Sequence, residues 1–141
     1  MATVPTSSPR WLTVVALVAL VWNAFGVAMY LSSVGVFGDP MAGLSEPERA
    51  AASSIPGWVT GAFAIGTFAG LTGSVGLLLR RAWAQPVLLL SMVALLALEG
   101  WIVFFSGALA VFGIAVPITV SAAAVFLAWL AIHARRQGWS S

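Results

Sequence analysis

Long apolar runs separated by short polar connections dominate the sequence. Four such runs cover residues 11–33, 57–79, 85–106 and 110–132. Each is close to the roughly 20 residues that an α-helix needs to cross a hydrocarbon core of about 30 Å. The pattern predicts an all-α fold, an integral membrane antiparallel four-helix transmembrane bundle, with residues 1–141 forming a single transmembrane domain.

The sizeable polar stretch between runs is the loop 38–56, which follows the first run. Within it, Ser45 followed by Glu48 fits a capping box, and Pro47 suits a first helical turn. Pro56 would end such a helix before the second run begins. We therefore predict a short extracytoplasmic helix between spans one and two.

The connection between the third and fourth runs has hardly any length, near residues 107–109, and predicts a tight antiparallel hairpin. Pro117 lies inside the predicted fourth span. Because proline removes a backbone hydrogen bond in a helix interior, we expect a kink there.

The first run admits a second interpretation, since Arg10 precedes it and small residues such as Ala24 and Ala28 follow, as in a cleaved signal peptide. The apolar core of a signal peptide spans only about 7–15 residues. Here the uncharged stretch continues past Tyr30, so we expect the first run to be a retained membrane span.

Composition supports lipid as the surrounding solvent. Hydrophobic residues make up 61% of the chain and charged residues 7%, against about 25% charged in ordinary soluble domains. The net charge is +2, and the arginines are scattered, so a basic groove for nucleic acid is not indicated. Cysteine is absent and a single histidine is present, which gives too few ligands for a metal or haem site, and we expect no cofactor.

Arginine placement predicts the orientation. Arg10, the pair Arg80 and Arg81, and the pair Arg135 and Arg136 would all lie on one side of the membrane. The positive-inside rule then places both termini in the cytoplasm. We expect a multi-pass protein of the bacterial plasma (inner) membrane.

Small residues line one side of the second run, where Gly66, Gly70 and Gly73 allow another helix to approach closely. Packing within the chain is the simpler interpretation. A homodimer seam, or a contact with a larger membrane complex, is the alternative.

Glu99 is the ionisable residue deepest within a span. A charge at mid-membrane costs about 2.5–3.5 kcal/mol on insertion scales, so such residues usually have a partner or a function. At 1.5 Å per residue, Glu99 and Asn23 lie about 21 Å and 18 Å from the cytoplasmic ends of their spans. We hypothesise that Asn23 hydrogen-bonds Glu99, with Thr67 at the same level, either to join helices or to form a proton-linked or cation-binding site.

Aromatic residues gather toward the outer half, among them Trp22, Tyr30 and Trp101. They are candidates for the wall of a pocket, while an interfacial aromatic belt is the alternative. His133 lies at the far end of the fourth span from Glu99, so no catalytic constellation is expected and we do not predict an enzyme.

Three segments carry a resemblance: residues 22–26 (WNAFG) with Tyr30, 56–63 (PGWVTGAF) and 80–84 (RRAWA). With them, the chain resembles a group of small four-helix bacterial inner-membrane proteins of unknown function, some of which bear the automatic label "sugar transporter". The resemblance covers most of the chain and implies a four-helix membrane fold. It transfers no functional residue.

Two classes of function are therefore expected. The first is small-solute or proton-linked transport, which we expect to need a dimer because four helices of this length enclose little volume. The second is a non-catalytic accessory or assembly subunit that packs against a larger membrane complex through the glycine face.

Overall fold

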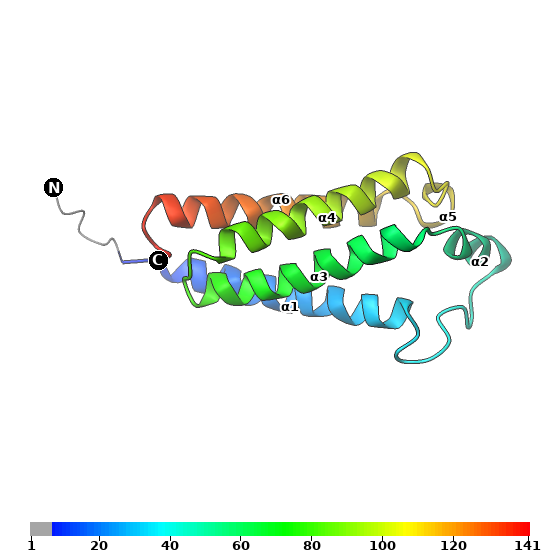
Figure 1. The fold of residues 1–141 in the computed structure, drawn as a ribbon, viewed down its shortest axis with the longest axis horizontal. Coiled ribbons are helices and arrows are strands. Elements are labelled where there is room, and N and C mark those ends of the chain that lie inside the picture. The colour runs from blue at the N-terminus through cyan, green and yellow to red at the C-terminus, as the bar shows by residue number, and fades with distance from the viewer. Residues whose placement is uncertain (1–6) are drawn as a thin grey trace.

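The computed structural model describes residues 7–141, and this part of the chain contains six helices and no strand. The long helices α1 (Arg10–Ser33), α3 (Gly57–Leu78), α4 (Ala84–Phe104) and α6 (Ala115–Arg136) lie side by side and alternate in direction (Figure 1). All four are long and apolar enough to cross a membrane. The short helices α2 (Glu46–Ser53) and α5 (Leu109–Phe112) lie together at one end of the bundle.

The two ends of the bundle differ in their connections. We call the end with α2 and α5 the loop end, and the end where α1 begins, α3 turns into α4 and α6 finishes the arginine end (Figure 1). Five of the six arginines lie at the arginine end, and Arg49 lies in α2.

The long helices pack in the order α1, α3, α4 and α6. Glycine allows α3 and α4 to approach closely: a Cβ added at Gly66 would lie 2.5 Å from Leu95 Cδ2, and one at Gly73 would lie 2.5 Å from Leu88 Cγ. Gly66, Gly70 and Gly73 are all buried. The glycine face of α3 is thus occupied by other helices of the same chain, by α4 at Gly66 and Gly73 and by Asn23 of α1 together with Ser91 of α4 at Gly70.

The core of the arginine end receives residues from all four long helices, and small side chains keep those helices close together. Its buried members are Leu12, Ala16, Ala19, Leu77, Ala84, Leu88, Leu127, Leu130, Ala131 and Ala134. The chain after α6 folds back over this end, where Trp139 contacts the ring of Trp11 edge-on at 5.8 Å. Ser141 N–H donates to Arg80 O at 2.9 Å, which holds this tail on the α3–α4 turn.

Helix α2 begins at the expected residue because its first turn is capped. Ser45 and Glu48 adopt the capping-box arrangement, and Pro47 lies in the first turn. Glu48 Oε2 accepts a bond from the backbone N–H of Ser45 at 2.8 Å and from its hydroxyl at 2.7 Å. Pro56 precedes α3, as predicted.

The predicted fourth span was wrong at its start. Helix α6 begins at Ala115 rather than at residue 110, because Gly113 adopts a φ of 77° and separates α6 from α5. The predicted tight hairpin is therefore a longer connection that contains α5. Pro117 lies in the first turn of α6, where no helical hydrogen bond is lost, so the expected kink has no cause there.

Candidate functional site

A groove of about 690 Å³ lies between the long helices in the half of the bundle nearer the loop end. Its floor is formed by buried residues of α3 and α4, including Val59, Thr67, Leu95, Leu98 and Glu99. Its two rims are formed by exposed residues of α1 and α6, the helices at the two ends of the packing order. Phe25 of α1 is 62% exposed, and Val116 of α6 is 63% exposed. The groove is thus open along the side of the bundle between α1 and α6.

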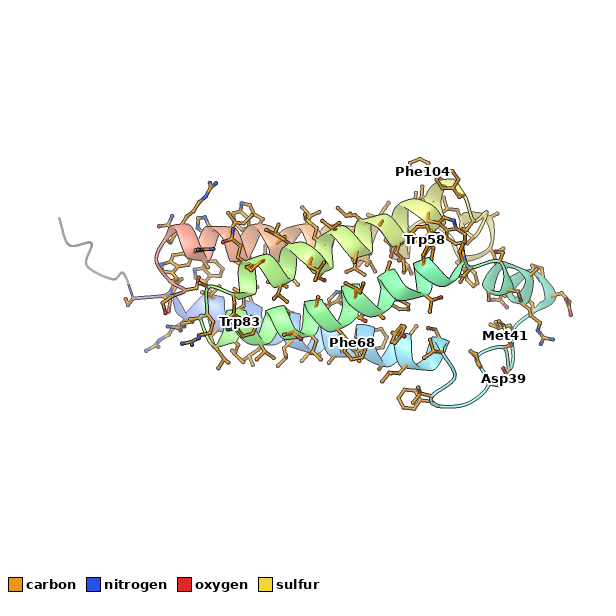
Figure 2. The ribbon with its side chains drawn as sticks, in the orientation of Figure 1. Asp39, Met41, Trp58, Phe68, Trp83 and Phe104 are labelled. Atoms are coloured by element: carbon orange, nitrogen blue, oxygen red, sulfur yellow. The ribbon has the colours of Figure 1, made fainter. Side chains whose placement is uncertain are left out.

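The groove is covered at the loop end by the segment between α1 and α3. Pro40 and Met41 come from the irregular part of this connection, and Ala52 comes from α2. Figure 2 shows Met41 and Asp39 on this connection, at the end of the bundle away from Trp83. The cover explains why the groove opens sideways rather than along the bundle axis.

Glu99 lies at the floor of the groove and is 6% exposed. Its Oε2 has no hydrogen-bond partner in the part of the chain that the structure describes. Glu99 also lines a second, smaller cavity of about 320 Å³ beneath α5. A glutamate that lines two cavities and has a buried carboxyl oxygen without a partner is the feature that most strongly indicates a binding site in this protein.

Asn23 also lines the groove, but it does not bond to Glu99 as hypothesised. Its Nδ2 donates to Ala19 O at 2.9 Å within α1 and to Ser74 Oγ of α3 at 3.2 Å. The reason is the packing order, in which α1 contacts α3 and not primarily α4. The two side chains lie at the same level of the bundle, but Asn23 lies in the contact between α1 and α3, whereas Glu99 comes from α4.

Thr67 lies on the floor of the groove and bonds to its own helix, because its hydroxyl donates to Phe63 O at 2.9 Å. Its methyl group faces α1, where a Cβ at Gly26 would lie 3.2 Å from Thr67 Cγ2. Ser91 of α4 donates to Gly66 O of α3 at 2.6 Å and joins these helices below the groove. Thr67 and Ser91 are therefore satisfied within the protein.

The three candidate pocket aromatics have different surroundings. Trp22 lines the groove, while Trp101 lines the smaller cavity and contacts Trp58 edge-on at 6.5 Å. Tyr30 is absent from the lining of both cavities and packs edge-on against Phe63 and Phe68, with ring centroids 5.6 Å and 5.9 Å away. Tyr30 thus packs behind Phe63, which itself lines the groove.

Most of the lining residues were not identified from the sequence. Apolar positions such as Met29, Phe63 and Ile102 look the same whether they face lipid, another helix or a groove. Met41 lies in the loop before α2 and Thr119 lies inside the predicted fourth span, and the pattern around neither residue indicated that it faces a groove. Gly26, whose missing side chain leaves room for Thr67, was an available signal of a close approach between α1 and α3 at this level.

Among residues 7–141, no three His, Cys, Asp or Glu side chains come together to hold a metal ion. Comparison of the chain with protein-family models, with curated proteins and with solved structures found no match. The groove and its carboxyl therefore have to be interpreted from their own geometry.

Proposed function

We propose that the chain is a multi-pass membrane protein whose four long helices form a transmembrane bundle. The exterior of the bundle supports this placement, since Val21 of α1 is 70% exposed and Val93 of α4 is 60% exposed. Aromatic side chains also project near both ends, with Trp83 toward one end and Trp58 and Phe104 toward the other (Figure 2). Two such bands suit the two interfaces of a bilayer.

The proposed orientation places the arginine end in the cytoplasm and the loop end outside. It is supported by the concentration of arginines at one end and by Asp39, Glu46 and Glu48 at the other. The proposed location is the bacterial plasma membrane, which is also what the resemblance described above implies. The groove then opens to the outer half of the bilayer.

We further propose that the protein binds a small solute in the groove and takes part in small-solute or proton-linked transport, with Glu99 as the binding residue. The observation that carries this proposal is the position of Glu99 at the floor of a groove of about 690 Å³, with a buried Oε2 that has no hydrogen-bond partner among the described residues. An ionised carboxylate inside a membrane costs about 2.5–3.5 kcal/mol, and binding a cation or a proton would offset that cost. Volumes of about 300–1,000 Å³ are typical of sites for small organic ligands.

The proposed binding does not need a dimer, because the groove lies within a single copy of the chain. The accessory-subunit hypothesis depended on a free glycine face. That face is occupied by Leu88 and Leu95 of α4, so a subunit contact would have to use another surface.

Transport is tested with purified protein reconstituted in lipid vesicles that carry a pH gradient. A mixture of small solutes extracted from cells is added outside, and the solutes that accumulate are measured by mass spectrometry. We expect at least one solute to accumulate with the native chain and not with Glu99→Gln. Glu46→Gln, which removes a carboxylate from α2 outside the groove, is the matched control and should behave as the native chain. Equal accumulation with the native chain and Glu99→Gln would refute the proposal.

A further inference from the structure

Four polar side chains around the groove share one property that the sequence does not reveal: their hydrogens are already used. The hydroxyl of Thr67 donates to Phe63 O at 2.9 Å, and that of Thr119 donates to Ala115 O at 2.8 Å. The hydroxyl of Ser33 donates to Tyr30 O at 2.7 Å in the same way. Each of these side chains can therefore offer a ligand only an acceptor oxygen. The Thr60 hydroxyl and the Trp22 indole N–H also line the groove, and within the described residues neither makes a hydrogen bond.

Asn23 follows the same pattern. Its Nδ2 makes two bonds, to Ala19 O and to Ser74 Oγ, which use both hydrogens of the amide. Its Oδ1 lies beside Gly70, at a place that a Cβ would fill. The group that Asn23 has left to offer is thus also an acceptor.

The charge of the groove has a single sign. Glu99 is the acid among the described lining residues, and none of these residues is Arg, Lys or His. The remaining lining is mostly apolar, with Leu95, Leu98 and Ile102 around the carboxyl. The complementary head group therefore carries hydrogen-bond donors and a positive charge, and it is attached to an apolar body.

The route into the groove also limits the ligand. The exposed rims Phe25 and Val116 lie on the side of the bundle, while Met41 and Ala52 cover the loop end. In the proposed membrane placement, this opening faces the acyl chains of the outer leaflet. A molecule that enters here is already dissolved in the bilayer.

We propose that the groove binds a membrane-dissolved amphiphilic amine, whose protonated nitrogen donates to Glu99 and to the acceptor oxygens while its apolar chain lies between α1 and α6. This proposal rests on the proposed membrane placement and solute binding and adds the ligand class and the lateral entry. A phospholipid acyl chain without a cationic nitrogen would leave the Glu99 carboxyl unpaired. An anionic head group would be repelled.

The test measures equilibrium binding to the full chain in nanodiscs of phosphatidylcholine, with empty nanodiscs to subtract partitioning into lipid. The probes share one alkyl chain and differ in the head group: dodecylammonium, dodecyltrimethylammonium and dodecanol. We expect dodecylammonium to bind about tenfold more tightly than dodecanol, because one charge-assisted hydrogen bond to Glu99 contributes about that difference in affinity. The trimethyl compound, which has a charge but no N–H, should bind between them. Preferential binding of dodecanol, or equal binding of the two cations, would overturn the proposed ligand class.

Two pairs of variants locate the binding. Glu99→Gln should remove the preference for dodecylammonium over dodecanol, and Glu46→Gln should retain it. Thr119→Trp, on the rim, should reduce the affinity for dodecylammonium about tenfold or more, whereas Ile118→Trp, on the neighbouring exposed position outside the groove, should not. A native affinity in Thr119→Trp would exclude the groove as the site. Each variant is first shown to have the native thermal unfolding midpoint.

Failure of this proposal can be distinguished from failure of the proposed function. If no amine binds but another solute accumulates in a Glu99-dependent way, the ligand class is wrong and transport stands. If the amine binds at Glu99 and no solute accumulates in vesicles, transport is wrong and the ligand class stands.

Discussion

At the scale of single residues, Gly70 is the position where three helices meet. Its missing side chain leaves room for Asn23 Oδ1 from α1, and Ser91 Oγ of α4 lies 3.1 Å from where a Cβ would be. Ser74 of α3 accepts a hydrogen bond from Asn23 and donates to Gly70 O at 2.8 Å. The buried amide and hydroxyls are thus paired among themselves, which leaves Glu99 as the acid that their network does not satisfy.

This arrangement predicts that Gly70→Ala destabilises the protein. The added Cβ would collide with Asn23, a buried side chain held by two hydrogen bonds, and would crowd Ser91. Overpacking of this kind costs about 1–3 kcal/mol. The midpoint of thermal unfolding in detergent should fall accordingly.

Gly61→Ala is the matched control, because Gly61 lies in the same helix and its added Cβ would meet nothing within 4 Å. Its unfolding midpoint should be unchanged or higher, since alanine is favoured over glycine in a helix by about 0.5–1 kcal/mol. A similar fall of the unfolding midpoint in both variants would show that the close approach at Gly70 is not the cause of the destabilisation.

The sequence allowed the level of each polar residue in the bundle to be predicted, but not its direction. Asn23 and Glu99 do line the same groove, because the rise of 1.5 Å per residue fixes position along a helix once the span is known. Their hydrogen bonds depend on how each helix is rotated about its axis. With apolar residues all around these helices, no amphipathic stripe reveals that rotation.

At the scale of elements, the helices α1, α3 and α4 were predicted to within two residues at each end, and α6 was not. Hydropathy cannot separate α5 from α6, since residues 109–118 are uniformly apolar apart from Gly113 and Pro117. The positive φ of Gly113 ends one helix before the other begins. For α2 the opposite holds, because its boundary depends on a local signal, the capping box, that can be read from Ser45 and Glu48.

The start of α2 should therefore depend on pH. The two bonds from Ser45 hold the pKa of Glu48 below its usual value of 4.5, with the backbone bond as the larger cause. A folded-state pKa below the unfolded one means that this cap is fully formed above the unfolded pKa and is lost as the pH falls through the folded pKa. We expect the amide NMR signal of Ser45 to shift on acidification with a midpoint below pH 4.5.

Two variants identify the group responsible for that shift. Glu48→Gln should make the Ser45 signal independent of pH. Glu46→Gln should leave the transition in place, because the Ser45 bonds go to Glu48. A transition that persists in Glu48→Gln would assign it to another group.

At the scale of the whole molecule, the two ends of the bundle are built differently. At the arginine end, alanines bring the helices together, and Trp139 lies over the core beside Trp11. Toward the loop end, larger lining residues such as Phe25 and Met29 stand along an open side. The bundle is therefore closed by its packed core at the arginine end, and its groove is accessible laterally near the loop end. In the proposed membrane placement, the leaflet to which the groove opens depends on which end of the bundle faces the cell interior.

That orientation can be measured directly because the chain contains no cysteine. We expect Ala42→Cys, in the loop before α2, to react with a membrane-impermeant maleimide added to intact spheroplasts. Ser141→Cys, at the arginine end, should react only after the membranes are opened. The physical reason is the concentration of arginines at that end, which favours the cytoplasmic side.

Labelling of Ser141→Cys in intact spheroplasts with protection of Ala42→Cys would show that the topology is the inverse of the proposed one, with the groove open to the inner leaflet. Labelling of both would show that the helices do not separate the two ends by a membrane.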